Sequence, residues 1–321
     1  MAADRVERRA VIACESAGGR LDAALAELWP EFSRSRIAGW IRDGAIRLDG
    51  RSIKPRHRLE GGERVTLSAE LQPHDQTRPE AIALSVLHSD PAFLVIDKPP
   101  GLVVHPGSGN RSGTLVNALL HHDPALAPLP RAGLVHRLDK DTSGCLLVAR
   151  TTASHAALVA ALKRREISRR YQALVWGDLI AGGTVDAPLG RHPVDRRRQI
   201  VRLDGRPARS HYRIARKLAG ATLLEVMLET GRTHQIRVHM AHIRHPIVGD
   251  PVYGRRGAPA GLTPSQRMLW QAFPRQALHA RELAFPHPTD GRPVAVRAPL
   301  PEDLARLLAG LSHEAPAHDA S

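Results

Sequence analysis

A short polar stretch of the chain gathers the kinds of side chain that carry out acid, base and nucleophilic chemistry. Residues 136–144 read His-Arg-Leu-Asp-Lys-Asp-Thr-Ser-Gly, and an apolar segment lies on either side of them. Catalytic groups are often found on loops held between buried strands. A β-turn that uses Asp, Thr, Ser and Gly would account for residues 141–144. Because a turn does not explain His136 and Arg137 ahead of Asp139, the stretch favours a functional loop.

A second motif places cations at the start of a predicted helix. Residues 231–239 read Gly-Arg-Thr-His-Gln-Ile-Arg-Val-His, in which Arg232 and Arg237 are candidate partners for a carboxylate or a phosphate. A neighbouring arginine favours the ionised form of an aspartate. The same residues fit a solvent-exposed basic helix face equally well, so the motif leaves both interpretations open.

Charge is unevenly distributed along the chain. Its 321 residues include 46 lysines and arginines against 32 aspartates and glutamates, a net charge of +14. An excess of this size favours a polyanionic partner. Four basic windows, residues 34–58, 163–170, 191–217 and 232–256, together carry +22, and the remainder of the chain carries −8. This clustering predicts an extended surface that contacts the phosphates of a nucleic acid.

The N-terminal part of the chain is predicted to form a small module over residues 18–70. Its first helix ends at Pro30, and Ser33 is a candidate N-cap for a second helix. Two short strands are expected at residues 45–48 and 64–67, each next to a turn that contains glycine. The pattern therefore predicts two helices followed by a small hairpin.

This module resembles the S4-like RNA-binding domain, because its second helix and the loop that follows carry several basic residues. A generic basic helical module is the alternative interpretation. The resemblance implies RNA contacts from five side chains, namely Arg34, Arg36, Arg42, Lys54 and Arg56.

A larger domain is expected over residues 81–311, after a linker at 71–80. Residues 1–17 are expected to form an N-terminal arm and 312–321 a disordered tail. Predicted strands outnumber predicted helices and do not alternate with them regularly, which favours an α+β domain with a mixed, mainly antiparallel sheet. The strands are expected at 93–96, 144–149, 171–176, 211–218 and 223–229, and the helices at 115–120, 153–167, 233–243 and 303–311.

Several ordered motifs together resemble those of the RluA-type pseudouridine synthases. The pattern His-Arg-Leu-Asp-x-x-Thr-Ser-Gly at 136–144 is similar to the signature loop of this family, and 231–239 is similar to its third motif. Four further segments match, namely 98–106, 170–173, 245–250 and 275–280. The resemblance runs from about residue 18 to residue 311, and many family members also carry an S4-like module.

The resemblance implies a reaction that breaks the bond between ribose and uracil N1, turns the base and rejoins it through C5. Nothing is oxidised and no group leaves, so neither a cofactor nor a metal is expected. A carboxylate at the ribose is required, and the resemblance gives this role to Asp139. The carboxylate either attacks the anomeric carbon, as in a retaining glycosidase, or removes the 2′-hydrogen to give a glycal. The sequence leaves both routes open.

The family resemblance also implies roles for residues around the catalytic aspartate. Arg237 pairs with Asp139 and orients it, and Tyr171 stacks on the target base. A strand-face core residue is the alternative interpretation of Tyr171. Arg137 is expected to fill the gap left by a flipped uridine or to grip its phosphate. The expected substrate-binding residues are His136, Arg137, Arg232, His234 and Gln235.

Within the family, residues 104–110 and 231–254 are most similar to members that modify a hairpin of large-subunit rRNA. The expected partner is therefore this rRNA, free or within a pre-ribosomal particle, and the enzyme is expected to act as a monomer. The same chemistry on tRNA is one alternative, because target choice depends on the shape of the RNA-binding surface. A non-catalytic RNA-binding or ribosome-assembly factor is another, but pure binding has no use for Asp139, Tyr171 and Arg237 together.

Other kinds of site receive less support. A zinc site could be composed from His234, His239, His242 and His245, but their spacing places some on different helix faces and no cysteine supports it. The His-Arg-Leu-Asp pattern also occurs in kinase catalytic loops, yet a glycine-rich phosphate loop and an Asp-Phe-Gly motif are missing. Residues 107–109 lack the ending of a P-loop.

Cellular location can also be anticipated from composition. No window approaches the 18 uncharged apolar residues that a membrane span requires. Residues 1–9 contain several charged side chains, and no apolar core of a signal peptide follows them. We therefore expect a cytoplasmic protein without a membrane partner. The two cysteines, Cys14 and Cys145, are too few for a disulfide framework, and Cys145 lies in an apolar run that suggests the core.

Overall fold

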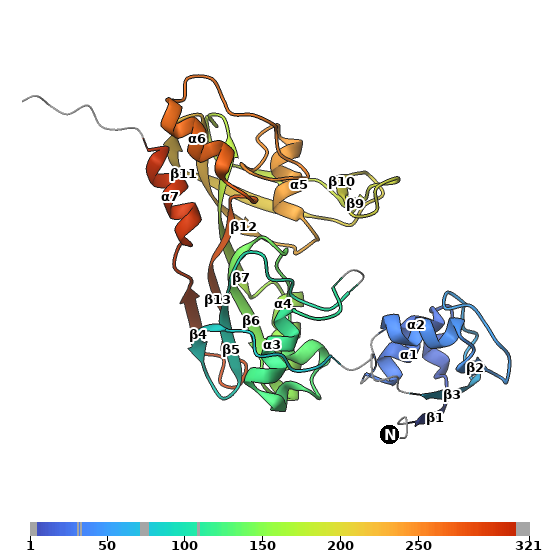
Figure 1. Ribbon diagram of the computed structural model, residues 1–321. Helices are drawn as coiled ribbons and strands as arrows, with labels where there is room; N and C mark the ends of the chain where they lie inside the picture. The colour runs from blue at the N-terminus through green and yellow to red at the C-terminus, as the bar shows by residue number, and fades with distance from the viewer. Residues whose placement is uncertain (1–4, 31, 33, 71–76, 108–109, 313–321) are drawn as a thin grey trace, which may run out of the picture. The chain divides into compact units, whose positions relative to one another are not determined.

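The computed structural model describes residues 5–30, 32, 34–70, 77–107 and 110–312 (Figure 1). Contacts between Cα atoms divide the chain into two compact units. The first comprises Met1–Pro79 with Ala127–Arg131, and the second comprises Glu80–Leu126 with Ala132–Ser321. Ser33, the expected N-cap, and most of the expected linker and tail lie outside the described residues.

The first unit contains two helices and a three-stranded sheet, so the predicted helices and hairpin are confirmed. The elements are β1 (Arg5–Val11), a 3-10 turn (Cys14–Ser16), α1 (Leu21–Leu28), α2 (Arg34–Arg42), β2 (Ile46–Leu48) and β3 (Arg64–Glu70). The sheet order is β1-β3-β2, and both pairings are antiparallel. Strand β1 was not predicted, because its sequence Arg-Val-Glu-Arg-Arg-Ala-Val has no apolar alternation.

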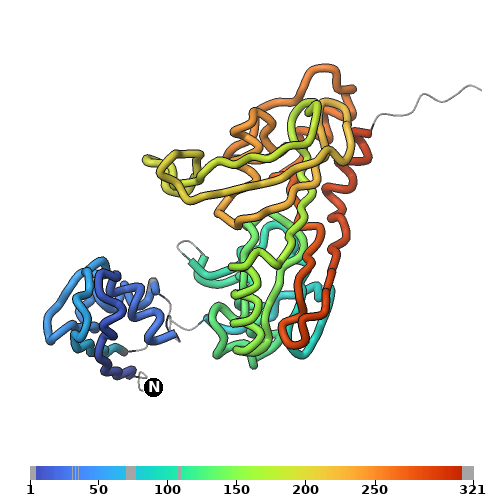
Figure 2. The backbone as a smooth tube through the Cα atoms, turned by 180° about the vertical axis from the view of Figure 1, so that it is seen from behind, coloured from blue at the N-terminus to red at the C-terminus, as the bar shows by residue number. Residues whose placement is uncertain are grey.

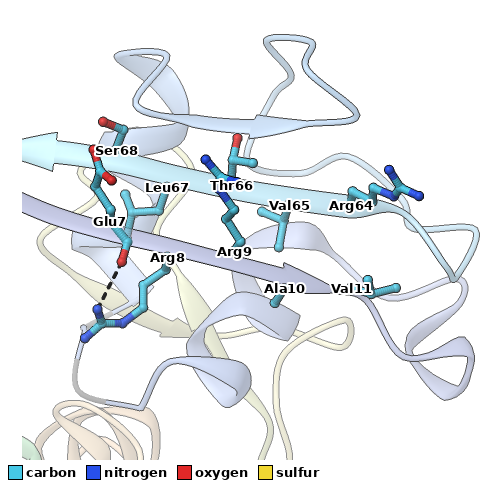
Figure 3. Close-up of a pocket in the computed structure, with 10 residues that line it drawn as sticks. All are labelled: Glu7, Arg8, Arg9, Ala10, Val11, Arg64, Val65, Thr66, Leu67 and Ser68. Atoms are coloured by element: carbon cyan, nitrogen blue, oxygen red, sulfur yellow. Dashed lines mark hydrogen bonds between the residues drawn. The ribbon is translucent and has the colours of Figure 1, made fainter.

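One face of this sheet packs against the two helices, and the other face is exposed. Val65 and Leu67 of β3 are buried, whereas Arg64, Thr66 and Ser68 between and beside them are exposed. This period of two is what a half-buried strand requires. Figure 3 shows Arg9 of β1 on the same side of the sheet as Thr66, and together these strands line a shallow hollow.

The second unit is built on a nine-stranded sheet of order β4-β5-β6-β13-β7-β12-β11-β8, in which β14 also pairs with β13. Strands β6 and β13 pair in parallel, and the other pairings are antiparallel. The predicted mixed, mainly antiparallel sheet is therefore confirmed. The strands are β4 (Ser85–Ser89), β5 (Phe93–Lys98), β6 (Ser143–Ala149), β7 (Ser168–Trp176), β8 (Gly183–Asp186), β11 (Arg209–Leu218), β12 (Ala221–Leu228), β13 (Leu278–Pro286) and β14 (Pro293–Arg297).

Five helices accompany this sheet in the described residues of the second unit. They are α3 (Leu115–His122), α4 (Thr152–Lys163), α5 (Gln235–His242), α6 (Pro264–Ala272) and α7 (Glu302–Gly310). Figure 1 shows α3 and α4 on one half of the sheet and α5, α6 and α7 around the other half. A two-stranded hairpin, β9 (Leu189–Arg191) with β10 (Gln199–Val201), projects from the half that holds α5 (Figure 2).

The core beneath α4 buries one face of strand β6. Leu158 of α4 packs into one cluster with Cys145 and Leu147 of β6 and with Phe285 of β13. Burial raises the pKa of the Cys145 thiol to about 12, so this cysteine is an inert core residue, as its apolar surroundings in the sequence predicted. Helix α4 ends at Lys163, four residues earlier than predicted, and Arg165 then adopts a left-handed conformation with φ of 62°.

The parallel pairing of β6 with β13 requires a glycine where the signature loop enters the sheet. Gly144 has φ of 109°, and it pairs with Ala280 of β13. A Cβ atom at this position would stand 2.2 Å from the carbonyl oxygen of Ala280. Both the backbone conformation and the close approach therefore exclude a side chain at residue 144.

We expect the replacement Gly144→Ala to lower the free energy of unfolding by about 3 kcal/mol, because it adds backbone strain and a clash with the next strand. Urea-induced unfolding followed by circular dichroism measures this value. Gly291 is a matched control, since its φ is 75° but nothing stands where its Cβ would be. Gly291→Ala should lose only about 1 kcal/mol, and equal losses at both positions would contradict the proposed clash.

Candidate active site

The carboxylate of Asp139 lies at the edge of a buried cluster of charges. Its side chain is 17% exposed, and its Oδ2 accepts a hydrogen bond of 3.1 Å from Nη1 of Arg237. Arg237 itself is buried in helix α5. Because Arg237 engages only one carboxylate oxygen of Asp139, Oδ1 is not taken by this pair.

A second carboxylate fixes the guanidinium of Arg237. Asp250 accepts from Nε at 2.7 Å and from Nη2 at 2.9 Å, a bidentate pair in which its side chain has no exposed area. The backbone N–H groups of Val252 and Tyr253 donate to the same carboxylate. Burial opposes the ionisation of Asp250, but the hydrogen bonds and charge of Arg237, together with the backbone N–H groups of Val252 and Tyr253, outweigh it, so the pKa lies below its usual value.

His234 and Tyr253 complete the surroundings of this arginine. The Cζ atom of Arg237 lies 5.1 Å from the centre of the Tyr253 ring. The Tyr253 hydroxyl accepts from the backbone N–H of Gln199 and lies 2.8 Å from Nδ1 of His234, to which it can donate its own proton. Nε2 of His234 then faces Oδ1 of Asp139 at 4.0 Å. Burial is the main reason that the pKa of His234 lies below its usual value.

Tyr171 occupies strand β7, between Val226 of β12 and Ala280 of β13. Its side chain is buried, and burial raises the pKa of its hydroxyl. The negative charge of Asp139 adds to that rise, which is evidence that the two residues lie in one electrostatic environment.

Two further predicted substrate-binding residues, Gln235 and Arg232, form hydrogen bonds with other residues of the chain. The Gln235 amide accepts from the N–H of Arg232 and from Thr230, and it donates to the carbonyl of Arg209 and to Ser210. It therefore braces the start of α5. The Nε of Arg232 donates to the carbonyl of Pro207.

Two of the predicted residues in the signature loop differ in their surroundings. His136 accepts from the N–H of Leu147 through Nε2, and burial lowers its pKa to about 3, so the ring is neutral. Arg137 is exposed, and its side chain has no hydrogen bond or ion pair among the described residues.

Two residues from the C-terminal part of the chain donate hydrogen bonds to the signature loop. Arg275, which forms a bidentate pair with Asp303, also donates to the carbonyl of Asp141 at 3.1 Å. Gln276 donates to the hydroxyl of Thr142 at 3.2 Å. The segment 275–280 matched the family pattern in the sequence, but these supporting roles could not be predicted from it.

Lys98 supports the same loop from within the core. Its side chain has no exposed area, and Nζ donates to the carbonyls of Pro99, Leu102 and Lys140 at 2.7, 3.1 and 2.8 Å. Burial lowers its pKa from 10.5 to about 7, and the negative charge of Asp141 only partly opposes the shift. Sequence reasoning missed this residue, because a lysine before two prolines carries no signal of burial.

The five predicted RNA-binding residues lie in the first unit, on α2 and in the loop after β2. Arg34 pairs with Asp22 at 2.9 Å, and Nε of Arg42 donates to the carbonyl of Ala38. The Cζ atom of Arg36 lies 5.7 Å from the centre of the Trp40 ring. The side chains of Lys54 and Arg56 are exposed.

The four histidines considered for zinc do not converge. His239 contacts the hydroxyl of Ser210 and the carbonyl of Ala187, and His245 contacts the carbonyl of Trp176. Within the described residues, no group of three or more His, Cys, Asp or Glu side chains could hold a metal ion. Nor does any helix in that part of the chain have the length and apolar character needed to cross a membrane.

Two segments of the sequence and the fold of the second unit match known domains. Residues 92–242 match the family described as RNA pseudouridylate synthase, and residues 19–65 match the S4 domain. The structure of human RNA pseudouridylate synthase domain containing 1 is 26% identical, with a TM-score of 0.55 over 73% of this chain and 89% of that one. The structure of human RNA pseudouridylate synthase domain containing 4 is 25% identical, with a TM-score of 0.56 over 71% of this chain and 92% of that one.

Bacterial relatives match almost the entire chain. A protein of Xanthomonas campestris named ribosomal large subunit pseudouridine synthase D is 54% identical, over 96% of this chain and 93% of its own. Proteins of the same name from Pseudomonas aeruginosa and Escherichia coli K12 are 48% and 47% identical, over at least 94% of each chain. The chain therefore belongs to the family of RNA pseudouridine synthases, which are enzymes that isomerise uridine in RNA.

We expect Asp250→Asn to lower the free energy of unfolding by about 3 kcal/mol, because it removes the bidentate partner of a buried arginine. Chemical denaturation of the purified variant measures the loss. Asp195→Asn is the control, since Asp195 pairs with Arg197 at the surface, and it should leave the unfolding midpoint unchanged. If both variants were as stable as the parent, Asp250 would not be the anchor of Arg237.

A second prediction concerns pH. The pKa of Lys98 is about 7 when folded and 10.5 as a free side chain, so the unfolded chain binds more protons between these values. The contribution of Lys98 to the free energy of unfolding must then rise with pH across that interval. Relative to Lys98→Met, the parent should gain about 1 kcal/mol of unfolding free energy per pH unit. Denaturation curves recorded between pH 7 and 10 test this, and parallel profiles for the two proteins would contradict it.

Proposed function

We propose that this chain converts specific uridines of large-subunit rRNA into pseudouridine, with Asp139 as the catalytic carboxylate. The observation that carries the proposal is the pairing of a partly exposed Asp139 with a buried Arg237. The names of the bacterial relatives support the rRNA target, because the match covers nearly the whole of each chain.

The geometry of Asp139 supports a reaction at the ribose. Arg237 holds Oδ2, which leaves Oδ1 to attack the anomeric carbon or to remove the 2′-hydrogen. Either route ends with the N1–C1′ bond broken and the C5–C1′ bond formed, while the proton lost from C5 is balanced by one gained at N1. No electrons are exchanged with a cofactor in this reaction.

The remaining residues of the site prepare the uridine. Tyr171 stacks on the target base, and its electrostatic interaction with Asp139 supports this role. The exposed side chain of Arg137 fills the position that the flipped base leaves, since extruding a base costs a few kcal/mol of stacking. His234 faces Asp139 and contacts the nucleotide from the α5 side.

The first unit extends the contact with RNA. We assign residues 18–70 to RNA binding through Arg34, Arg36, Arg42, Lys54 and Arg56, and residues 81–311 to catalysis. The basic side chains supply contacts to phosphates, which are sequence-independent and sensitive to salt. The enzyme acts as a cytoplasmic monomer on free rRNA or on a pre-ribosomal particle.

Asp139→Asn should abolish the reaction while RNA binding persists, because the amide can neither attack the ribose nor accept its proton. The test is pseudouridine mapping of total RNA by carbodiimide labelling and primer extension in cells that lack the gene. Cells rescued with the parent should regain specific large-subunit sites, and cells rescued with Asp139→Asn should lack them.

Other outcomes of this experiment would change the proposal in defined ways. If tRNA sites vanish and rRNA sites persist, the chemistry stands and the target is tRNA. If no site changes, and ribosome assembly is restored equally by the parent and by Asp139→Asn, the chain acts as a non-catalytic assembly factor.

A further inference from the structure

Strand β7 carries a buried cation that the mechanism described above does not use. Arg169 is only 9% exposed, and its side chain makes no hydrogen bond or ion pair with any described residue. Its Nε atom is fully enclosed. Arg170, the next residue, is exposed and lies 3.7 Å from Glu282.

An unpaired guanidinium in this position is energetically unfavourable. Removing a charge from water costs several kcal/mol unless a partner of opposite charge compensates. The other two buried arginines each have such a partner, Asp250 for Arg237 and Asp303 for Arg275. Arg169 is the exception among the buried arginines of the described residues, and its guanidinium is therefore available to an anion from outside the chain.

The surroundings of Arg169 are those of the active site. Side chains alternate along a strand, so Arg169 shares the face of β7 with Tyr171, at a distance of about 7 Å along the strand. Burial raises the pKa of Tyr171 and the positive charge of Arg169 opposes that rise, whereas for His136 this charge adds to the lowering of the pKa by burial. His136 accepts through Nε2, which leaves the proton of the neutral ring on Nδ1, and this atom is also enclosed without a partner.

Gly231, the first residue of the third motif, makes room for this side chain. A Cβ atom at Gly231 would stand 2.5 Å from Nη1 of Arg169. The glycine therefore lets the guanidinium lie against the loop that leads into α5, where Arg237 and His234 originate.

We propose that Arg169 binds a phosphodiester group of the RNA next to the target uridine and so positions that nucleotide over Asp139. The inference rests on the proposed function, because it takes RNA as the substrate. A phosphate is favoured over a uracil carbonyl, since the buried charge requires an anion and the planar guanidinium matches two phosphate oxygens. Arg169 is a positioning residue, and the reacting atoms remain those of Asp139 and the uridine.

Thermal unfolding separates this role from a structural one. Replacing an unpaired buried charge with an apolar side chain of similar length should stabilise the free enzyme, so Arg169→Met should raise Tm by about 2–6 °C. Arg170→Met, on the opposite face of the same strand, is the control and should leave Tm unchanged. A fall in Tm for Arg169→Met would show that Arg169 has a structural partner and would overturn the proposal.

Steady-state kinetics test the contact between Arg169 and a phosphate. The substrate is total RNA from cells lacking the gene, which contains the target whichever class of RNA it belongs to. Arg169→Met should lower kcat/KM at least tenfold, and the slope of log kcat/KM against log salt should become shallower by about 0.7–0.9, the value of one phosphate contact. Arg169→Lys should restore part of the rate and the slope, whereas Arg306→Met, which replaces an exposed arginine that pairs with Glu302 outside the basic windows, should match the parent.

The outcomes distinguish this inference from the proposed function. An unchanged salt slope in Arg169→Met would overturn the phosphate contact, even if pseudouridine formation by the parent is normal. If the parent forms pseudouridine in tRNA only, the target is corrected and the slopes still decide the role of Arg169. If the parent forms none in any RNA, the proposed function fails, and this inference fails with it.

Discussion

A single buried arginine joins the two carboxylates on which the site depends. An unpaired charge on Arg237 would be costly in the core, and Asp250 accepts two hydrogen bonds from its guanidinium. The side chain of Asp250 itself has no exposed area. Nη1, which Asp250 does not engage, donates to Asp139. The position of Asp139, the proposed catalytic carboxylate, therefore depends on the folding of a helix and a loop that lie about a hundred residues later in the chain.

The signature loop is held largely by cations that act on backbone carbonyls. Lys98 donates to the carbonyl of Lys140, and Arg275 donates to the carbonyl of Asp141. Neither side chain donates to Asp139, so these contacts hold the loop and leave the carboxylate to which the reaction is assigned in our proposal. Such contacts hold the polar loop between the 3-10 helix Pro130–Gly133 and strand β6.

The sequence predicted the motifs and the type of sheet more readily than the supports beneath the loop. Asp139, Arg237 and Tyr171 could be singled out because the motifs that contain them resemble those of a known family. Lys98 and Asp250 could not, since their function follows from burial and from partners that are distant in sequence. Strand β1 was missed for a related reason, because its pairing with β3 depends on backbone hydrogen bonds rather than on apolar alternation.

The parallel pairing of β6 with β13 also has a consequence for protein synthesis. Ser143 and His279, which contact each other at this junction, are separated by 136 residues. At the usual rates of translation, roughly 7–27 s pass between the appearance of the first strand and that of the second. During that interval β6 lacks one of its neighbours in the sheet, because β13 lies between β6 and β7. A polypeptide that ends before β13 therefore contains both Asp139 and Arg237, but it lacks the strand that joins the signature loop on β6 to Tyr171 on β7.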